Sequence, residues 1–510
     1  MISPSSPSAL PPGCIVWEGD QFSDHSLATV NRGICSRLLG AGVDLRLLAD
    51  DAPTGAVPAG PLRSLLPAVG PPRPGAPVAA VVRQAWPPRL QAPAVGRWVQ
   101  VQPWEFGGIP RRWIDGLAAA DDVWAYSSWV RDCYVASGRD PDRVHVVPAG
   151  VDAGFFRPDG ARRPYGRGRS FRFLFVGGLI YRKGIDVLVN AYLRAFGPRD
   201  DVCLVIKGFG SAGIYAGNTR NQLLQLAART DLPAIEIIDE EMDAEGMASL
   251  YRSCDALVHP YRGEGFALPV IEAMASCLPV VTTGYGAVLD FADEDTARFL
   301  PARLVPAPLV EEELGPPAAL SYFLAEPDAD ALVEALRALP ADDARFQRAR
   351  LARARVSRAF SWEAAASVAL ERLLELTGGS RGHRAPVEVT DLVLPVEPAS
   401  TNWEGMVRDF VSTFHGSDPI RLRLGVRGSP GDAKTLGAAA RRVIVGAERN
   451  PATCAAIEVA PLDDRSQAAL VASGALVLDG SGGGLRAAGH GLPPALQARL
   501  GAGELSSMPA

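Results

Sequence analysis

The sequence predicts an α/β protein with two doubly wound domains that face one another across a cleft, followed by a further α/β extension. Short apolar segments alternate with amphipathic stretches in two successive series, which is typical of parallel strand–helix–strand units. A polar, arginine-rich segment at residues 157–170 separates the two series and predicts a hinge. At 510 residues the chain has room for about three domains, which we place at residues 1–158, 159–378 and 388–510.

The first series begins near Cys14 and predicts the N-terminal domain. Its expected strands cover residues 14–19, 43–49, 97–104, 122–128 and 144–152. Its expected helices cover residues 26–42, 111–120 and 130–138. Residues 53–80 are rich in Pro, Gly and Ala, so we expect a loop or an irregular crossing there.

The second series predicts another domain of the same Rossmann-like type. Its expected strands cover residues 171–178, 202–208, 234–240, 255–260 and 279–284. Its expected helices cover residues 184–196 and 268–276. Two such domains joined by a hinge form a cleft between the carboxyl ends of their sheets, where ligands of these folds bind.

The last segment, residues 388–510, follows an expected linker at residues 378–387. Its stretch AAIEV (455–459) is similar to PAIEI (233–237) in the second domain. The similarity indicates a degenerate copy of the second domain, although unrelated α/β sequences share apolar strands of this kind.

Composition and charge argue against several classes of function. A net charge of −6 is unlike that of a general nucleic-acid binder, which needs a basic face to neutralise phosphates. The seven cysteines are scattered without a C-x-x-C pair and the six histidines never fall at metal-ligand spacing, so we expect reduced thiols, no metal site and a cytoplasmic protein. No signal peptide and no uncharged apolar run of ~18 residues is present, whereas peripheral contact with the inner membrane stays open.

The strongest chemical signal is the block EGFALPVIE, which runs from Glu264 to Glu272 after an expected strand. Pro269 suits the first turn of a helix, because its missing N–H costs nothing there. Glu264 then lies at the helix entrance and Glu272 on its second turn, where one carboxylate can hold sugar hydroxyls and the other a ribose diol. Backbone N–H groups at the positive end of the helix dipole would seat a diphosphate. These groups belong to Gly265, Phe266, Ala267 and Leu268.

A second block, FVGGLIYRKGID (175–186), joins an expected strand to an expected helix. Its strand ends in Gly177 and Gly178, which permit close approach of a ligand to the backbone. Arg182 and Lys183 follow and suit the neutralisation of a departing diphosphate. Ordinary β–α loops also expose basic residues, so this block indicates a diphosphate site only in combination with the block at residues 264–272.

The two blocks together resemble the retaining family-4 (group 1) glycosyltransferases, which have the two-domain GT-B fold. The hinge end AGVDAGFFRP (149–158) and the late helix FSWEAAASVALERLL (360–374) are similar as well, and the resemblance covers residues 14–378. In that family the glutamate that matches Glu264 contacts the donor sugar, and the glutamate that matches Glu272 holds the nucleotide ribose. The lysine that matches Lys183 binds the phosphates of the donor.

The chain departs from the family pattern at two places. Gly178 stands where the family commonly has an arginine, and Arg182 or Lys207 could supply the missing charge. The family often has a histidine after a first-domain strand, whereas residues 101–107 here read VQPWEFG. Glu105 therefore stands near the expected reaction centre, for hydroxyl recognition or as an ordinary loop carboxylate.

Two further segments lie after first-domain strands and could line the acceptor side. They are the loop at residues 19–25 and Trp86 with its two following prolines. His25 in the first segment is more typical of a solvated loop residue.

The resemblance implies a retaining hexosyltransferase that moves a sugar from a nucleotide-diphosphate sugar to a glycan or glycoconjugate acceptor, as in polysaccharide biosynthesis. We expect a metal-independent front-face displacement with no cofactor beyond the nucleotide-sugar donor, which is a co-substrate. The alternative is a catalytically decayed nucleotide-sugar-binding or scaffold protein. An isomerase or phosphorylase on the same two-domain plan is a further alternative, for which no lysine-cofactor signature is found.

Overall fold

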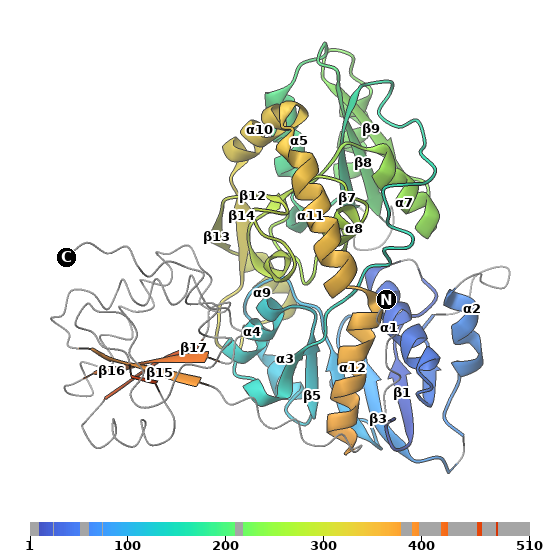
Figure 1. Cartoon of the computed structure of the whole chain (residues 1–510), viewed down its shortest axis with the longest axis vertical. Helices are drawn as coiled ribbons and strands as arrows, with labels where there is room; N and C mark the ends of the chain where they lie inside the picture. The colour runs from blue at the N-terminus through green and yellow to red at the C-terminus, as the bar shows by residue number, and fades with distance from the viewer. Residues whose placement is uncertain are drawn as a thin grey trace. The chain divides into compact units, whose positions relative to one another are not determined.

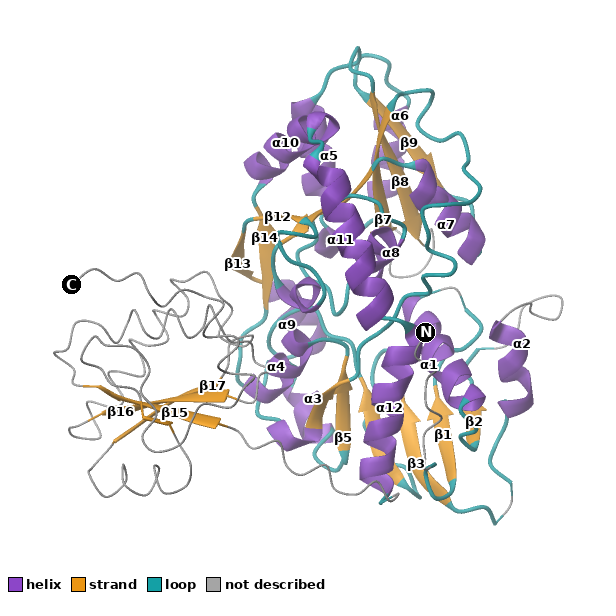
Figure 2. Ribbon diagram, viewed as in Figure 1, coloured by secondary structure: helices purple, strands orange, loops and turns teal. Residues whose placement is uncertain are grey.

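A computed structural model describes residues 10–23, 25–51, 61–73, 75–209 and 218–378, together with four strands nearer the C-terminus. The chain forms two compact units, Met1–Arg381 and Gly382–Ala510, and each is described here by itself (Figure 1). The first unit holds two parallel six-stranded sheets with helices packed on them (Figure 2). This arrangement confirms the predicted fold class.

The first sheet has the strand order β2-β1-β3-β4-β5-β6, and every neighbouring pair is parallel. Its strands are β1 (Cys14–Glu18), β2 (Leu45–Leu48), β3 (Val78–Arg83), β4 (Arg97–Val101), β5 (Asp122–Ala125) and β6 (Val144–Val146). Its helices are α1 (Ser26–Gly40), α2 (Pro61–Leu65), α3 (Arg111–Gly116) and α4 (Ser128–Ala136). Residues 78–80, which the sequence placed in a loop, belong to β3, because Val78 and Ala80 pair with β1.

The second sheet has the order β12-β11-β10-β7-β8-β9 and is also parallel. Its strands are β7 (Phe171–Gly178), β8 (Val202–Phe209), β9 (Ala234–Ile238), β10 (Ala256–His259), β11 (Val280–Thr283) and β12 (Arg298–Leu300). Its helices include α5 (Ile185–Ala195), α6 (Asn218–Ala227), α7 (Ala244–Ser253), α8 (Leu268–Ala275), α10 (Ala329–Ala338) and α11 (Ala344–Ala359). The strand order reverses between β7 and β10, so the loops that follow these two strands face each other at the topological switch point.

The last helix of the first unit, α12 (Trp362–Thr377), returns to the first sheet and packs against α1 (Figure 1). Trp362 lies so close to Gly33 that a Cβ atom there would come within 2.3 Å of the indole ring. Arg372 of the same helix donates to Asp122 at 2.9 Å. The first domain is therefore completed by residues from the end of the unit.

A short hairpin, consisting of β13 (Ala302–Pro306), α9 (Pro308–Leu314) and β14 (Phe323–Pro327), follows β12. The segment that leads into β14 runs against residues 106–111 of the first domain. Phe323 N–H donates to Phe106 C=O at 2.9 Å, and Ala318 N–H donates to Ile109 C=O at 2.9 Å. This hairpin, residues 302–327, thus bridges the two domains.

The second unit contains a parallel sheet of four described strands in the order β17-β16-β15-β18. They are β15 (Thr390–Val396), β16 (Ile420–Val426), β17 (Ala456–Pro461) and β18 (Leu476–Val477). Parallel strands fit the predicted α/β extension. Residues 379–387 of the predicted linker, and the rest of this unit, lie outside the described residues.

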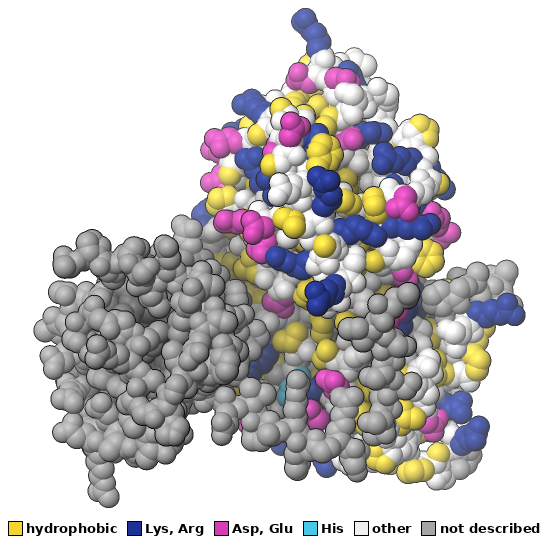
Figure 3. Space-filling view, in the orientation of Figure 1, with side chains coloured by type: hydrophobic (Ala, Val, Ile, Leu, Met, Phe, Trp, Pro, Cys, Tyr) yellow, Lys and Arg dark blue, Asp and Glu magenta, His cyan; other side chains and the backbone are white. Residues whose placement is uncertain are grey.

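The visible face of the first unit carries basic side chains among acidic ones (Figure 3). Arginines are frequent in α11, where Arg348 pairs with Asp342 and Arg355 pairs with Asp293 at 2.7 Å. Among the described residues, no helix has the length and apolar character needed to cross a membrane.

Candidate active site

The site is built on the two loops that face each other at the switch point of the second sheet. After β7 the chain makes a short helical turn, Tyr181–Lys183, and enters α5 through Gly184. Gly184 has a φ of 73°, and a Cβ atom there would lie 1.9 Å from the carbonyl oxygen of Pro260. Only glycine allows this approach, which brings the Arg182–Lys183 turn against the loop after β10.

The amino end of α8 lies beside this contact. The helix begins at Leu268 with Pro269 in its first turn, as the sequence predicts, and Ala267 precedes it with a φ of 71°. Within the described part of the chain, the N–H groups of Gly265, Phe266 and Ala267 donate to no protein acceptor. These groups sit at the positive end of the helix dipole and can bind an anion.

Glu264 is the centre of a buried cluster of charged groups. Its carboxylate lies 2.5 Å from Lys183 Nζ, 3.0 Å from His259 Nε2 and 3.8 Å from Arg182 Nη1. Burial alone would raise the pKa of Glu264, but the Lys183 ammonium and the His259 ring outweigh it and hold that pKa well below its usual range. Glu264 is therefore ionised near neutral pH and can only accept hydrogen bonds.

The pKa values of two partners of Glu264 are both lowered by burial. Burial lowers the pKa of Lys183, and Glu264 opposes that effect. Burial also lowers the pKa of His259, whose ring stacks on Phe175 at 5.7 Å between centroids. The site thus combines an ammonium that is paired with a carboxylate and an imidazole that favours its neutral form.

Arg182 links this cluster to the first domain. Its guanidinium donates to Gly263 C=O at 2.8 Å and lies 3.6 Å from Glu105 Oε1, so the predicted candidate Glu105 does lie beside the second-domain loops. A small cavity lies next to them. Its walls include Glu105, Trp129, Tyr261, Glu264, Tyr285 and Phe323. Ligand pockets commonly measure ~300–1,000 Å³, and this cavity is far smaller, so the structure holds the cleft in a form too narrow for a nucleotide sugar.

The two domains are in contact close to the amino end of α8. Ser127 Oγ, which caps α4, donates to Gly265 C=O at 3.0 Å. Asp290 accepts from the N–H of Ser128 at 2.7 Å, and burial raises the pKa of Asp290 to about 6. These contacts hold the cleft narrow.

Glu272 lies apart from the Glu264 cluster. Its Oε2 accepts from the Tyr251 hydroxyl of α7 at 2.8 Å. Burial raises the pKa of Glu272 to about 7, although the hydrogen bond from Tyr251 lowers it. The two glutamates of the predicted pair therefore sit in different environments, one ionised and one close to half-protonated at neutral pH.

The remaining predicted residues lie at the ends of β7 and β8. Gly177 and Gly178 pair with Gly208 and Phe209. Because Gly178 has no side chain, the charge expected near this strand end must come from another residue. Lys207 is buried and its Nζ donates to Gly208 C=O at 2.8 Å. Burial lowers the pKa of Lys207, and the nearby Asp239, Glu240 and Glu241 raise it. The structure thus sets Lys207 against the acidic end of β9, whereas Arg182 is the cation beside Lys183.

The acceptor-side candidates lie on the loops of the first sheet. His25 is the N-cap residue of α1, where its Nδ1 accepts from Ala28 N–H at 3.3 Å, and it pairs with Asp20. Its side chain is 46% exposed, so the expected solvated residue also has a structural role. Trp86 is 42% exposed and packs edge-on against Trp113.

Two residues of the site were missed by sequence reasoning. His259 is the last residue of β10, and Arg262 is a buried arginine two positions before Glu264. The only sequence signal was their position at the carboxyl end of a predicted strand, where ligands of such folds bind. Among the described residues, no group of three or more His, Cys, Asp or Glu side chains could hold a metal ion.

Two facing Rossmann-like domains of this kind define the GT-B class of fold. Solved structures share it. A glycosyltransferase from Rickettsia africae is 16% identical with a TM-score of 0.52, covering 71% of this chain and 98% of that chain. Sucrose-phosphate synthase from Thermosynechococcus elongatus is 18% identical with a TM-score of 0.54, covering 72% of this chain and 99% of that chain. At such identities the likeness establishes the fold alone.

Sequence comparison shows which family the second domain is similar to. Residues 161–303 match the family model of glycosyl transferases group 1. A D-inositol 3-phosphate glycosyltransferase of Catenulispora acidiphila is 32% identical, over 36% of this chain and 47% of that relative. The corresponding relative in Xylanimonas cellulosilytica is 30% identical, over 47% of this chain and 53% of its own length. The chain therefore spans about half the length of these relatives, and its residues 161–303 are similar to the group 1 glycosyltransferases, which confirms the resemblance.

Proposed function

We propose that the protein is a retaining glycosyltransferase that moves a sugar from a nucleotide-diphosphate sugar to a glycan or glycoconjugate acceptor. The observation that supports this most strongly is the meeting of Lys183 and Arg182 with Glu264 beside the free N–H groups of α8. Two cations and a helix amino end suit a diphosphate, and an ionised carboxylate suits the hydroxyl groups of a sugar.

The donor diphosphate would lie on Lys183, Arg182 and the N–H groups of Gly265 to Ala267. A phosphate oxygen that reaches Lys183 competes with Glu264 for the ammonium, which frees acceptor positions on the carboxylate for a donor hydroxyl. Glu272 would hold the ribose. Its raised pKa, about 7, makes this contact dependent on pH.

The reaction proceeds in this proposal by front-face displacement. The bond from the anomeric carbon to the diphosphate oxygen breaks, and the acceptor oxygen bonds to that carbon on the same face. The acceptor proton passes to the departing phosphate oxygen. Lys183, Arg182 and the helix N–H groups offset the charge that develops on this oxygen, so the step needs no metal ion.

A double displacement suits the geometry less well. A carboxylate nucleophile must be free to attack the anomeric carbon, with a partner carboxyl about 5 Å away. Glu264 is held by Lys183 and His259, and Glu272 is bonded to Tyr251.

Binding of nucleoside diphosphates tests the proposed donor class. A solved neighbour, Anabaena Alr3699/HepE, was crystallised with UDP and glucose, so UDP heads a panel with GDP and ADP. Thermal unfolding would be followed with each nucleotide and with its glucose ester. We expect one diphosphate to stabilise the protein by about 2.7 kcal/mol at a hundredfold excess over its Kd. Failure of all three to bind would contradict the proposal.

The alternative is a catalytically decayed, nucleotide-sugar-binding protein. Turnover separates the two functions. An enzyme releases free nucleoside diphosphate from the sugar donor when an acceptor mixture is added, whereas a scaffold binds the donor and releases none.

A further inference from the structure

Arg262 is an arginine in the interior of the second domain, between the two loops that form the candidate site. Its side chain is only 3% exposed. The guanidinium donates to Asp186 at 2.7 and 2.8 Å and to Glu326 at 2.5 and 2.9 Å. It also lies over the ring of Tyr181, 3.6 Å from the ring centroid. A buried cation with two bidentate carboxylate partners is fixed in position.

Arg262 holds the backbone of the turn that carries Arg182 and Lys183. Its Nη1 donates to Tyr181 C=O at 2.6 Å. Its own N–H donates to Arg182 C=O at 2.8 Å. Both carbonyls belong to the residues just before Lys183, and Arg262 itself is two residues before Glu264. The residue therefore spans the two loops whose side chains meet.

The same guanidinium reaches the bridging hairpin, residues 302–327. Glu326 belongs to β14, and Ala325 N–H donates to Arg262 C=O at 2.8 Å. The residues just before β14 run along residues 106–111 of the first domain, where Gly108 N–H donates to Ser321 C=O at 3.2 Å. Glu105 immediately precedes that stretch and lies 3.6 Å from Arg182.

We propose that Arg262 is a positioning residue that fixes the Arg182–Lys183 turn against Glu264 and couples it, through Glu326, to the hairpin lying on the first domain. The inference rests on the proposed function, because it gives the turn its role in binding a diphosphate. Arg262 also lines the cavity beside Glu264, but its role in this proposal is to hold the turn. Movement of the first domain relative to the second is transmitted along the hairpin to the cations that meet the diphosphate.

The test compares the dissociation constant of a nucleoside diphosphate with that of its monophosphate. The probe is whichever of UDP, GDP and ADP binds the wild-type protein most tightly, paired with UMP, GMP or AMP, and calorimetry gives both constants. Arg262→Met should reduce the preference for diphosphate at least fivefold, because the Arg182–Lys183 turn is released while the nucleoside site remains. Arg262→Lys keeps the charge and should recover part of the preference. Glu326→Gln should cause a smaller loss.

Arg199→Met is the matched control, since Arg199 is an exposed arginine of the same domain that lies outside the hairpin and the two loops. It should leave the preference unchanged. Thermal melts establish that each variant is folded at the assay temperature. If Arg262→Met is unfolded, the test depends on Arg262→Lys and Glu326→Gln. An unchanged preference in the folded Arg262 variants, or an equal loss of both nucleotides, overturns the inference while the proposed function stands. A wild-type protein that binds none of the diphosphates overturns both.

Discussion

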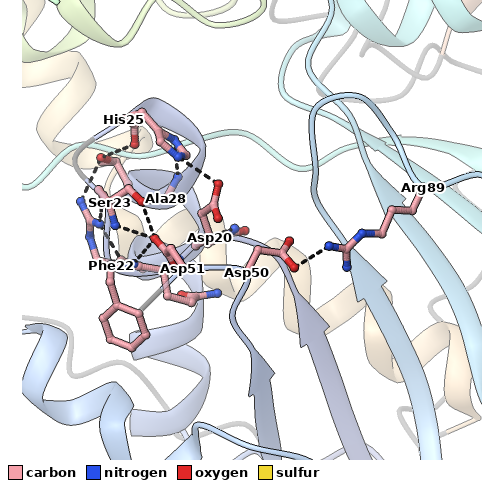
Figure 4. A network of polar contacts seen from close by, with 12 residues as sticks. Asp20, Phe22, Ser23, His25, Ala28, Asp50, Asp51 and Arg89 are labelled. Carbon is pink, nitrogen blue, oxygen red and sulfur yellow. Dashed lines mark hydrogen bonds and ion pairs between the residues drawn. The ribbon is translucent and has the colours of Figure 1, made fainter. Parts of the chain in front are cut away.

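At the switch point of the second sheet, Lys183 and Arg182 lie in the loop that faces the residues just before α8. The N–H groups of Gly265, Phe266 and Ala267 there donate to no acceptor within the residues that the structure describes. At the matching edge of the first sheet, the backbone donors already bind a carboxylate of the chain itself (Figure 4). Asp51, which follows β2, accepts from the N–H groups of Gln21 and Phe22 at 2.8 Å. It also accepts from the N–H of Ser23 at 2.6 Å and from its hydroxyl at 2.5 Å.

The arginines at this edge of the first sheet form ion pairs with carboxylates of the chain. Arg89 bonds to Asp50 (Figure 4). It also lies 3.5 Å from Glu18, and Arg83 bonds to Glu18 at 2.7 Å. A phosphate would have to displace Asp51 from its N–H groups or separate these ion pairs. The loops at the carboxyl edge of a Rossmann-like sheet can therefore serve in two ways. In the second domain we propose that they bind an anion, whereas in the first domain they are held together by a carboxylate of the chain itself.

The largest expected effect comes from the second edge. Lys183→Ala and Glu264→Ala should each lower the rate of sugar transfer at least tenfold, which corresponds to more than about 1.4 kcal/mol of transition-state stabilisation. The reason is that one removes a cation from the diphosphate and the other removes the acceptor for donor hydroxyls. Initial rates of nucleotide release, with circular dichroism to establish folding, provide the measurement.

Arg199→Ala, an exposed arginine of the same domain, serves as the control for these variants. If both site variants transferred sugar at the wild-type rate, the loops that carry Lys183 and Glu264 would have no role in the reaction. The proposed difference between the two domains would then be wrong.

The intermediate effect comes from the first edge and concerns stability. Asp51→Ala removes four hydrogen bonds to a carboxylate and should lower the free energy of unfolding by about 1–3 kcal/mol. The Kd of a nucleoside diphosphate should stay within twofold of the wild-type value. Urea unfolding and calorimetry give the two quantities, and a large loss of nucleotide binding would place the diphosphate on the first domain instead.

The contribution of Asp51 should also depend on pH. Burial would raise its pKa, but the hydrogen bonds from Gln21, Ser23 and Phe22 lower it in the folded protein. Because the folded pKa lies below the unfolded value of about 3.9, the stabilisation is complete above that pH and is lost as the pH falls through the folded pKa. The stability difference between wild type and Asp51→Ala should be constant from pH 5 to 7 and should shrink below about pH 4.

Local sequence patterns predicted most of the fold and part of the site. Apolar strands, the Pro269 helix start and the two loops around Lys183 and Glu264 depend on residues close together in the chain, so they could be recognised. The start of β3 was missed because Pro and Gly around residues 70–77 obscure the strand pattern. The hairpin contact and the packing of α12 on α1 depend on residues more than two hundred positions apart.

The same limit applies to individual side chains. His259 and Arg262 gain their roles from partners on other loops, namely Glu264, Asp186 and Glu326. Asp51 was not a candidate, since an aspartate after a short strand is common and its N–H donors lie about thirty residues earlier. Lys207 was a reasonable candidate for a missing charge, but the acidic end of β9 could not be placed beside it without the strand order.

The smallest expected effect distinguishes the carboxylates by the sign of their pH dependence. Burial raises the pKa of Glu272 to about 7, above the unfolded value of about 4.3. The folded protein therefore binds more protons between these values, and stability falls as the pH rises through about 7. Urea unfolding at pH 5 and pH 8 provides the measurement. Between these values the wild type should lose stability relative to Glu272→Gln, because glutamine cannot ionise. The contribution of Asp51 to stability should be the same at both pH values. A wild-type protein that gains stability over the Glu272→Gln variant between pH 5 and pH 8 would mean that the folded pKa of Glu272 lies below its unfolded value, as that of Asp51 does.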